Sequence, residues 1–145
     1  MVKLRDNLYL GGYKDIGDGR EMRALGVTAV LNVAYELDDP PMYPTEVRYA
    51  KVGLADSSEN KDYMKALAVS TLVQMLTEGE VVFVHCAAGL SRSVYAAAMA
   101  LALIENKDWH DTFDEIKKEN PFALIGPLFH GENVWYRDEE EEKAG

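Results

Sequence analysis

Short apolar runs along the chain predict the strands. The run Val27–Val33 is continuous and rich in β-branched residues, which is typical of a central strand buried on both faces. Val81–Val84 has the same character. Val47–Leu54 alternates enough between apolar and polar residues to form a strand, and Leu8–Leu10, which precedes two glycines, predicts a short strand followed by a turn.

Between these runs lie segments whose apolar residues recur at helical spacing, or that are apolar on nearly every side of a helix. One such segment is stopped by Gly79, another by Gly26, and a third begins behind the capping residue Asp108. The predicted helices are Arg20–Leu25, Asp62–Glu78, Ser93–Ile104, Trp109–Glu119 and a last one between Pro127 and Tyr136. Strands that alternate with helices predict an α/β domain, with a central, mostly parallel sheet of about four to five strands flanked by helices.

Composition and charge narrow the class of protein. With 145 residues, 48% of them hydrophobic, the chain predicts one folded domain, which we place at residues 1–137. Residues 138–145 hold five acids and one lysine and predict a disordered tail. The net charge of −10 argues against nucleic acid as a partner, and the longest apolar stretch is too short to span a membrane. We therefore expect a monomer without membrane or nucleic-acid partners.

The single cysteine, Cys86, stands at the most informative place in the sequence. One cysteine cannot form an internal disulfide and the start of the chain has no apolar signal segment, so we expect a reducing, cytoplasmic location. Cys86 follows the predicted strand Val81–Val84 and precedes a predicted helix. A strand that enters a helix through a tight loop points several backbone N–H groups at one spot, which suits a phosphate-sized anion and also stabilises a thiolate.

The residues of this loop fit a phosphate cradle. Gly89 allows a backbone conformation that a β-carbon would prevent, and Arg92 offers a planar fork for two phosphate oxygens. If Cys86 forms a covalent intermediate with a phosphoryl group, the thiolate is the leaving group when that intermediate is hydrolysed, and we expect the Ser93 hydroxyl to hydrogen-bond it. We interpret Ser91 as a loop or cap residue. The residues expected to bind the phosphate are Ala87, Ala88, Gly89, Leu90, Ser91 and Arg92.

The stretch His85–Ser93 resembles the His-Cys-x-x-Gly-x-x-Arg-Ser/Thr signature of the cysteine-based protein tyrosine phosphatases, and its ending looks most like the dual-specificity group. Leu8–Gly11 and Leu25–Val33 resemble that group's opening strand and first core strand. Asn120-Pro121 stands where the family usually has Arg-Pro. The resemblance implies hydrolysis of phosphotyrosine, and of phosphoserine and phosphothreonine, on phosphoproteins through a phosphocysteine intermediate, without a metal or cofactor.

The resemblance also implies a general acid on a loop before the cysteine. Asp56 lies 30 residues upstream of Cys86 and fits this role, with Glu59 as the only close substitute. His85 is expected to orient the loop through hydrogen bonds and to help hold the thiolate. Asn32 is a candidate for tying neighbouring loops together. His110 and His130 have no ligand spacing that would indicate a metal site.

Three alternatives stay open at this point. The chain could be a phosphate-binding module without turnover, or a cysteine enzyme of another kind that transfers sulfur or reduces arsenate. It could also be a phosphatase for a non-protein phosphomonoester, such as a phosphoinositide or an RNA 5′-phosphate. The neutral side chains of Ala87, Ala88 and Leu90 disfavour an inositol headgroup with several phosphates, and the acidic chain disfavours RNA.

Overall fold

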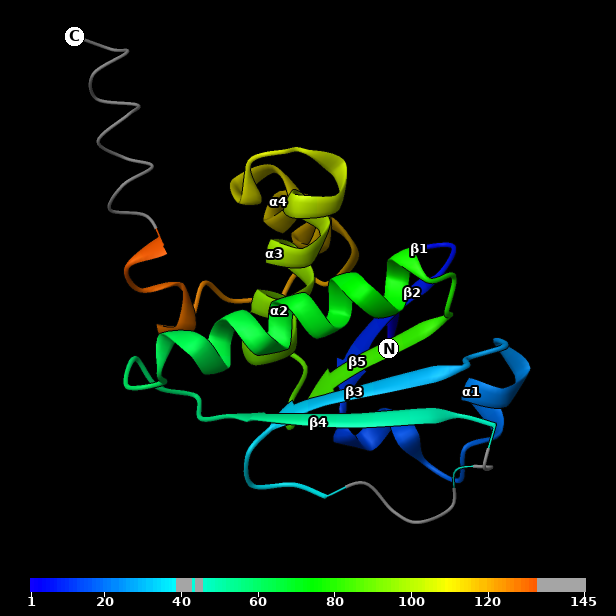
Figure 1. Cartoon of the computed structure of the whole chain (residues 1–145). Helices are drawn as coiled ribbons and strands as arrows, with labels where there is room; N and C mark the ends of the chain where they lie inside the picture. Colours follow the sequence, from blue (N-terminus) through cyan, green and yellow to red (C-terminus); the bar gives the residue numbers. More distant parts are fainter. Residues whose placement is uncertain (39–42, 44–45, 133–145) are drawn as a thin grey trace, which may run out of the picture.

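The computed structural model describes residues 1–38, 43 and 46–132, and in this part of the chain five strands form one sheet. The strands follow the order β1-β2-β5-β3-β4 across the sheet (Figure 1). β1 runs antiparallel to β2, and all other neighbours are parallel, which confirms the predicted α/β class. The strands are β1 (Val2–Arg5), β2 (Leu8–Gly12), β3 (Ala29–Ala34), β4 (Arg48–Leu54) and β5 (Val82–Cys86).

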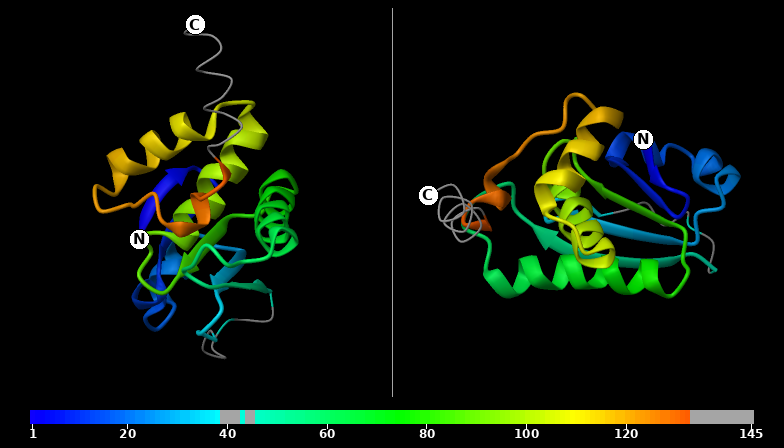
Figure 2. Two further views of the ribbon diagram at one scale, coloured as in Figure 1. Left: turned by 90° about the vertical axis from the view of Figure 1, so that its left-hand side faces the viewer. Right: turned by 90° about the horizontal axis from the view of Figure 1, so that it is seen from above.

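Helices cover both faces of the sheet. On one face lie α2 (Asp62–Thr77) and α3 (Arg92–Glu105), and α4 (Trp109–Glu119) packs on α3 (Figures 1 and 2). The other face is covered by the short helix α1 (Arg20–Ala24) and a 3₁₀ turn, η1 (Tyr13–Ile16). Asp108 caps α4 as expected, because its carboxylate accepts the backbone N–H of His110.

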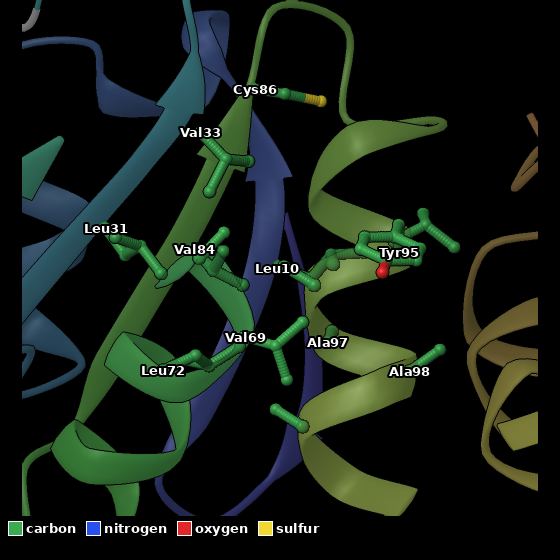
Figure 3. Packing of buried hydrophobic residues seen from close by; sticks show 14 of the residues in the cluster. Leu10, Leu31, Val33, Val69, Leu72, Val84, Cys86, Tyr95, Ala97 and Ala98 are labelled. Carbon is green, nitrogen blue, oxygen red and sulfur yellow. The ribbon is translucent and has the colours of Figure 1, made fainter. Parts of the chain in front are cut away.

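Successive side chains along each strand point to opposite faces of the sheet, so they contribute to two hydrophobic cores, one on each face. Val84 and Cys86 of β5 point to the face that α2 and α3 cover (Figure 3). Phe83, which precedes Val84 and points to the opposite face, packs into the second core beneath α1, against Tyr9 and Val30 of the neighbouring strands. This burial of β5 on both faces explains why its sequence is a continuous apolar run.

Two parts of the fold differ from expectation. β1 was not predicted, because this edge strand is only partly buried and carries Lys3 and Arg5, which interrupt any apolar pattern. The last predicted helix is wrong at its start: the structure has a 3₁₀ turn, η2 (Pro127–Phe129), after which Gly131 adopts a positive φ of 90°. Residues 133–136 of that prediction, and the tail 138–145, lie outside the described residues.

The parallel strands place their carboxyl ends along one edge of the sheet. There Gly12 of β2 pairs with Cys86 of β5, and Ala34 of β3 pairs with Leu54 of β4. In open α/β sheets, ligands bind outside this edge. No helix within the described residues is long and apolar enough to cross a bilayer.

An ion-pair cluster fastens the edge strand to the helices. The Arg5 guanidinium donates two hydrogen bonds to Glu105, at 2.7 and 2.8 Å, and one to Glu115 at 2.9 Å. These bonds hold the pKa of Glu105 down at about 2. A carboxylate whose pKa is lowered by folding stabilises the fold above its unfolded pKa, and that stabilisation disappears as the pH falls toward 2.

We therefore expect Arg5→Met to lower the melting temperature at neutral pH by about 2–4 °C, the shift that about 1 kcal/mol causes in a domain of this size. The difference from the wild type should shrink as the pH falls below about 4.5, where unfolded carboxylates become protonated. Arg20→Met is the control, because the pair between Arg20 and Asp18 is largely exposed. Equal shifts for both variants, measured by calorimetry across pH, would contradict this role of the cluster.

Candidate active site

The loop between β5 and α3 surrounds the sulfur of Cys86. Cys86 ends β5 with its side chain directed toward the start of α3, and the residue is only 2% exposed (Figure 3). The backbone N–H of Gly89 donates to Sγ at 3.3 Å, and the Ser93 hydroxyl lies 3.2 Å from Sγ. Ser93 Oγ also lies 3.3 Å from the Gly11 carbonyl oxygen, so its one proton has two acceptors within reach.

Glycines allow the loop to pack directly against the end of β2. Gly89 has a φ of 75°, and a β-carbon there would lie 2.6 Å from the carbonyl carbon of Gly11. A β-carbon at Gly12 would lie 2.8 Å from the carbonyl oxygen of Ala87. The N–H of Tyr13 donates to that same oxygen at 2.9 Å. The loop is thus held in shape by backbone contacts that tolerate no side chain.

Backbone donors of this loop face a pocket. The N–H groups of Ala87, Ala88 and Leu90 make no hydrogen bond with any part of the chain that the structure describes. The pocket has a volume of about 210 Å³, and its walls include these three residues together with Asp56, Cys86, Ser91, Arg92 and Leu124. Free N–H groups around a small pocket at a helix N-terminus are what an anion site requires.

The Arg92 side chain is held by Glu36, a residue that the sequence analysis did not identify. Nη1 and Nη2 of Arg92 donate to the two carboxylate oxygens of Glu36 at 2.6 and 2.7 Å. Nη1 donates further to the Leu54 carbonyl oxygen at 2.8 Å. These hydrogen bonds lower the pKa of Glu36 to about 2 and raise the pKa of Arg92 above its usual value.

This arrangement leaves one side of the guanidinium available. Of the five N–H donors of Arg92, both on Nη1 and one on Nη2 are used by Glu36 and Leu54. The Nε–H and the second Nη2–H form the other fork of the guanidinium and have no acceptor among the described residues. Because Arg92 lines the pocket, this fork can bind two oxygens of a phosphate.

Asn32 fixes the loop that carries Glu36. Its amide nitrogen donates to the Leu37 carbonyl oxygen at 2.7 Å and to the Tyr49 hydroxyl at 3.1 Å. Its amide oxygen accepts the N–H of Ala34 at 2.8 Å. Asn32 is completely buried, so these bonds replace contacts with water. The expected tie between loops is therefore present.

Asp56 reaches the same pocket from the carboxyl end of β4. Its Oδ1 accepts a hydrogen bond from the Ser91 hydroxyl at 3.2 Å. Ser91 is the N-cap residue of α3, in line with its interpretation as a loop or cap residue, but its hydroxyl makes no capping hydrogen bond and contacts Asp56 instead. Gly126 leaves room for this contact, since a β-carbon there would lie 2.0 Å from Ser91 Oγ. Asn60 stabilises the loop by hydrogen bonds to Ala55 and Ser57.

The other candidates have distinct positions. His85 is fully buried, stacks on Phe83 at 5.4 Å between ring centroids, and lies with Nδ1 3.2 Å from the Cys86 carbonyl oxygen. A carbonyl only accepts, so Nδ1 carries the proton in this contact. Glu59 does not line the pocket. His110 pairs with Asp108 at the start of α4, and within residues 1–38, 43 and 46–132 no cluster of His, Cys, Asp or Glu could hold a metal ion.

Comparison with known proteins agrees with this geometry. Residues 8–129 match the family model described as "Dual specificity phosphatase, catalytic domain". This chain belongs to the dual specificity phosphatase family. Its relatives in that family include the "Probable rhodanese domain-containing dual specificity protein phosphatase" of Dictyostelium discoideum, which is 30% identical over 127 residues, 87% of this chain and 26% of that protein.

Other dual specificity phosphatases show similar likeness. "Dual specificity protein phosphatase 12" of Mus musculus is 30% identical over 135 residues, 88% of this chain and 38% of that protein. The chain thus spans about a quarter to two fifths of the length of these relatives. The crystal structure of a variant of human DUSP28 has the same fold, with a TM-score of 0.80 at 20% identity, covering 98% of this chain and 97% of that one.

For this dual specificity phosphatase domain we expect Glu36→Gln to lower kcat/KM for a small aryl phosphate roughly ten- to hundredfold, because a misplaced guanidinium costs about that much. A glutamine has one acceptor oxygen and cannot match both N–H donors of Arg92. Glu36 is ionised throughout the neutral pH range, so the ratio of wild type to variant should not change there. Asp38→Asn, two residues away in an exposed pair with Lys51, is the control and should behave as the wild type.

Proposed function

We propose that this chain is a phosphoprotein phosphatase that hydrolyses phosphotyrosine, and also phosphoserine and phosphothreonine, through a phosphocysteine intermediate. The observation that carries the proposal is the convergence of four groups on one pocket. Cys86, Arg92 with its free fork, the loop residues Ala87, Ala88 and Leu90, and Asp56 all line it. These are the parts that transfer of a phosphoryl group to sulfur needs.

Cys86 is the nucleophile in this proposal. Its thiolate attacks the phosphorus atom, a sulfur–phosphorus bond forms, and the bond to the leaving oxygen breaks. The N–H groups of the loop and the free fork of Arg92 stabilise the charge on the three equatorial oxygens. Glu36 keeps Arg92 in place from the other side, so that the fork does not have to be ordered when substrate arrives.

Asp56 is the general acid. Its carboxyl group protonates the leaving oxygen in the first step and, as carboxylate, takes a proton from the water that attacks the phosphocysteine in the second. The second step releases inorganic phosphate and returns the cysteine thiolate. The Ser93 hydroxyl, 3.2 Å from Sγ, donates to the sulfur as its bond to phosphorus breaks. His85 orients the loop through the Cys86 carbonyl.

The remaining expectations belong to the same proposal. Residues 1–137 form the catalytic domain and 138–145 an acidic tail. The partner is a phosphorylated protein, and we propose a cytoplasmic monomer that uses neither nucleic acid, membrane nor cofactor. The support for these points is the single cysteine, the net charge of −10 and the neutral side chains in the phosphate loop.

The decisive experiment is hydrolysis of a small aryl phosphate by the purified chain, with and without vanadate. Turnover that vanadate inhibits is expected, and a protein that binds phosphate without turnover would instead be a silent phosphate-binding module. Rates on phosphopeptides, phosphoinositides and RNA 5′-phosphates then compare the substrate classes. A kcat/KM higher for either non-protein class than for every phosphopeptide would overturn the protein substrate.

A further inference from the structure

Beside the catalytic pocket lies a row of exposed apolar side chains, which we call the apolar shelf: Phe122, Leu124 and Ile125. They are 74%, 52% and 53% exposed. They belong to the segment between α4 and η2, drawn in orange in Figure 2. Three neighbouring large apolar residues that face solvent mark a binding surface more often than a chance exposure.

The shelf is fixed to the phosphate loop. The N–H of Leu124 donates to the Leu90 carbonyl oxygen at 2.8 Å, and the Asn120 amide lies 3.4 Å from the Gly89 carbonyl oxygen. Ala123 is completely buried, so its neighbours on both sides face outward. Gly126 packs against Ser91. Because its backbone is held at these points, the shelf is ordered before any ligand binds, which lowers the entropic cost of binding.

The shelf is continuous with the catalytic pocket. Leu124 is one of the residues that line the pocket around Cys86. Beyond Ile125, the surface continues into a hollow of about 450 Å³ lined by Ile125, Gly126, Pro127, Phe129 and His130. A phosphoryl group bound at Cys86 therefore brings the adjoining part of its molecule onto the shelf.

The charges around this surface are of both signs, since Lys117 donates to the Ala123 carbonyl oxygen at 2.8 Å and Arg92 lines the adjoining pocket. From 121 to 129 the sequence contains no charged residue. Asp56 lines the pocket, Glu36 pairs with Arg92 behind it, and Glu59 lies exposed on the Asp56 loop.

From this geometry we infer that the apolar shelf selects phosphoprotein substrates with a large apolar side chain next to the phosphoresidue. This inference rests on the proposed function and names the class of substrate. Continuity with the pocket favours a substrate segment over a second copy of the chain. Three side chains also cover well under the roughly 800 Å² that each partner of a stable dimer buries. A net charge of −10 opposes anionic lipid.

The experiment compares phosphotyrosine peptides that differ at one position. In a background of glycine and serine, leucine, lysine or glutamate is placed at each neighbouring position in turn, and kcat/KM is measured. We expect leucine to exceed glycine about tenfold at one or two positions, the gain from seating one apolar side chain. A profile that is flat, or that favours glutamate, would overturn the inference.

Substitutions on the protein then test which residues cause the leucine preference. Phe122→Ser and Ile125→Ser should remove most of the leucine preference and leave the rate on a small aryl phosphate unchanged, because neither residue lines the catalytic pocket. Leu103→Ser, on α3, is the matched control, since Leu103 is 67% exposed yet outside the shelf. A leucine preference that survives both shelf variants would contradict the assignment.

Controls separate this inference from the proposed function. If the wild type does not hydrolyse the aryl phosphate, the proposed function fails, and the shelf inference, which rests on it, fails as well. If it hydrolyses the aryl phosphate and all peptides equally, only the shelf inference fails. Sedimentation at the assay concentration should give a monomer. A dimer that Phe122→Ser dissociates would assign the shelf to a second copy of the chain and overturn the inference.

Discussion

Cys86→Ser is expected to abolish turnover and to retain binding of phosphate esters. The hydroxyl of serine is a far poorer nucleophile than a thiolate. The donors that bind the phosphate are unaffected, because they are backbone N–H groups and the free fork of Arg92. Turnover of an aryl phosphate and calorimetric binding of a phosphotyrosine peptide measure the two properties separately.

Two controls make this result interpretable. Cys86 is buried in the core, so the melting temperature of the variant must be compared with that of the wild type before a loss of activity is assigned to chemistry. Ser93→Ala removes the hydroxyl that lies 3.2 Å from Sγ and should slow turnover without stopping it. A folded Cys86→Ser protein with more than about a tenth of the wild-type turnover would exclude a covalent mechanism on this sulfur.

Asp56→Asn is expected to lower kcat by roughly 10²–10⁴, the usual contribution of a general acid. Asparagine keeps the shape of the side chain, and its amide oxygen can still accept the Ser91 hydroxyl, so the loop should stay in place. The loss should be largest for substrates whose leaving oxygen is basic and should shrink for aryl phosphates with acidic leaving groups, which need little protonation.

The measurement is kcat for a series of aryl phosphates with leaving groups of increasing acidity. Glu59→Gln is the matched control, because Glu59 is the other carboxylate of this loop and does not line the pocket. Its kcat should equal that of the wild type for every leaving group. An Asp56→Asn deficit of the same size for good and poor leaving groups would mean that Asp56 is not the acid.

The sequence predicts the central strands and main helices because the residues within each element form a recognisable pattern. β3 and β5 lie in mostly apolar, valine-containing runs, and α3 is a largely apolar segment that begins at Arg92 after a loop with glycine. The residues of the edge strand β1 form no such pattern, because this strand is stabilised by pairing with β2 and by the ion pairs of Arg5. Long-range pairing of this kind leaves no periodic pattern in the residues concerned.

The same distinction applies to the site. Cys86 and Arg92 belong to one short motif and are visible in the sequence, whereas Glu36 lies 56 residues from the arginine that it holds. A weak signal existed, because Glu36 follows the first core strand and the loops after parallel strands meet at one edge. The contact between Ser91 and Asp56, 35 residues apart, also depends on the folded arrangement of two loops and was not predicted.

The close backbone packing of Gly89 on Gly11 and Gly12 also bears on how the reaction ends. A cradle shaped before the substrate arrives recognises the phosphoryl group itself and is indifferent to the molecule that carries it. Inorganic phosphate presents the same oxygens to the same donors once it is released from the sulfur. In the proposed reaction the product therefore competes with each new substrate, and the rate depends on the surrounding phosphate concentration as well as on the supply of phosphoprotein.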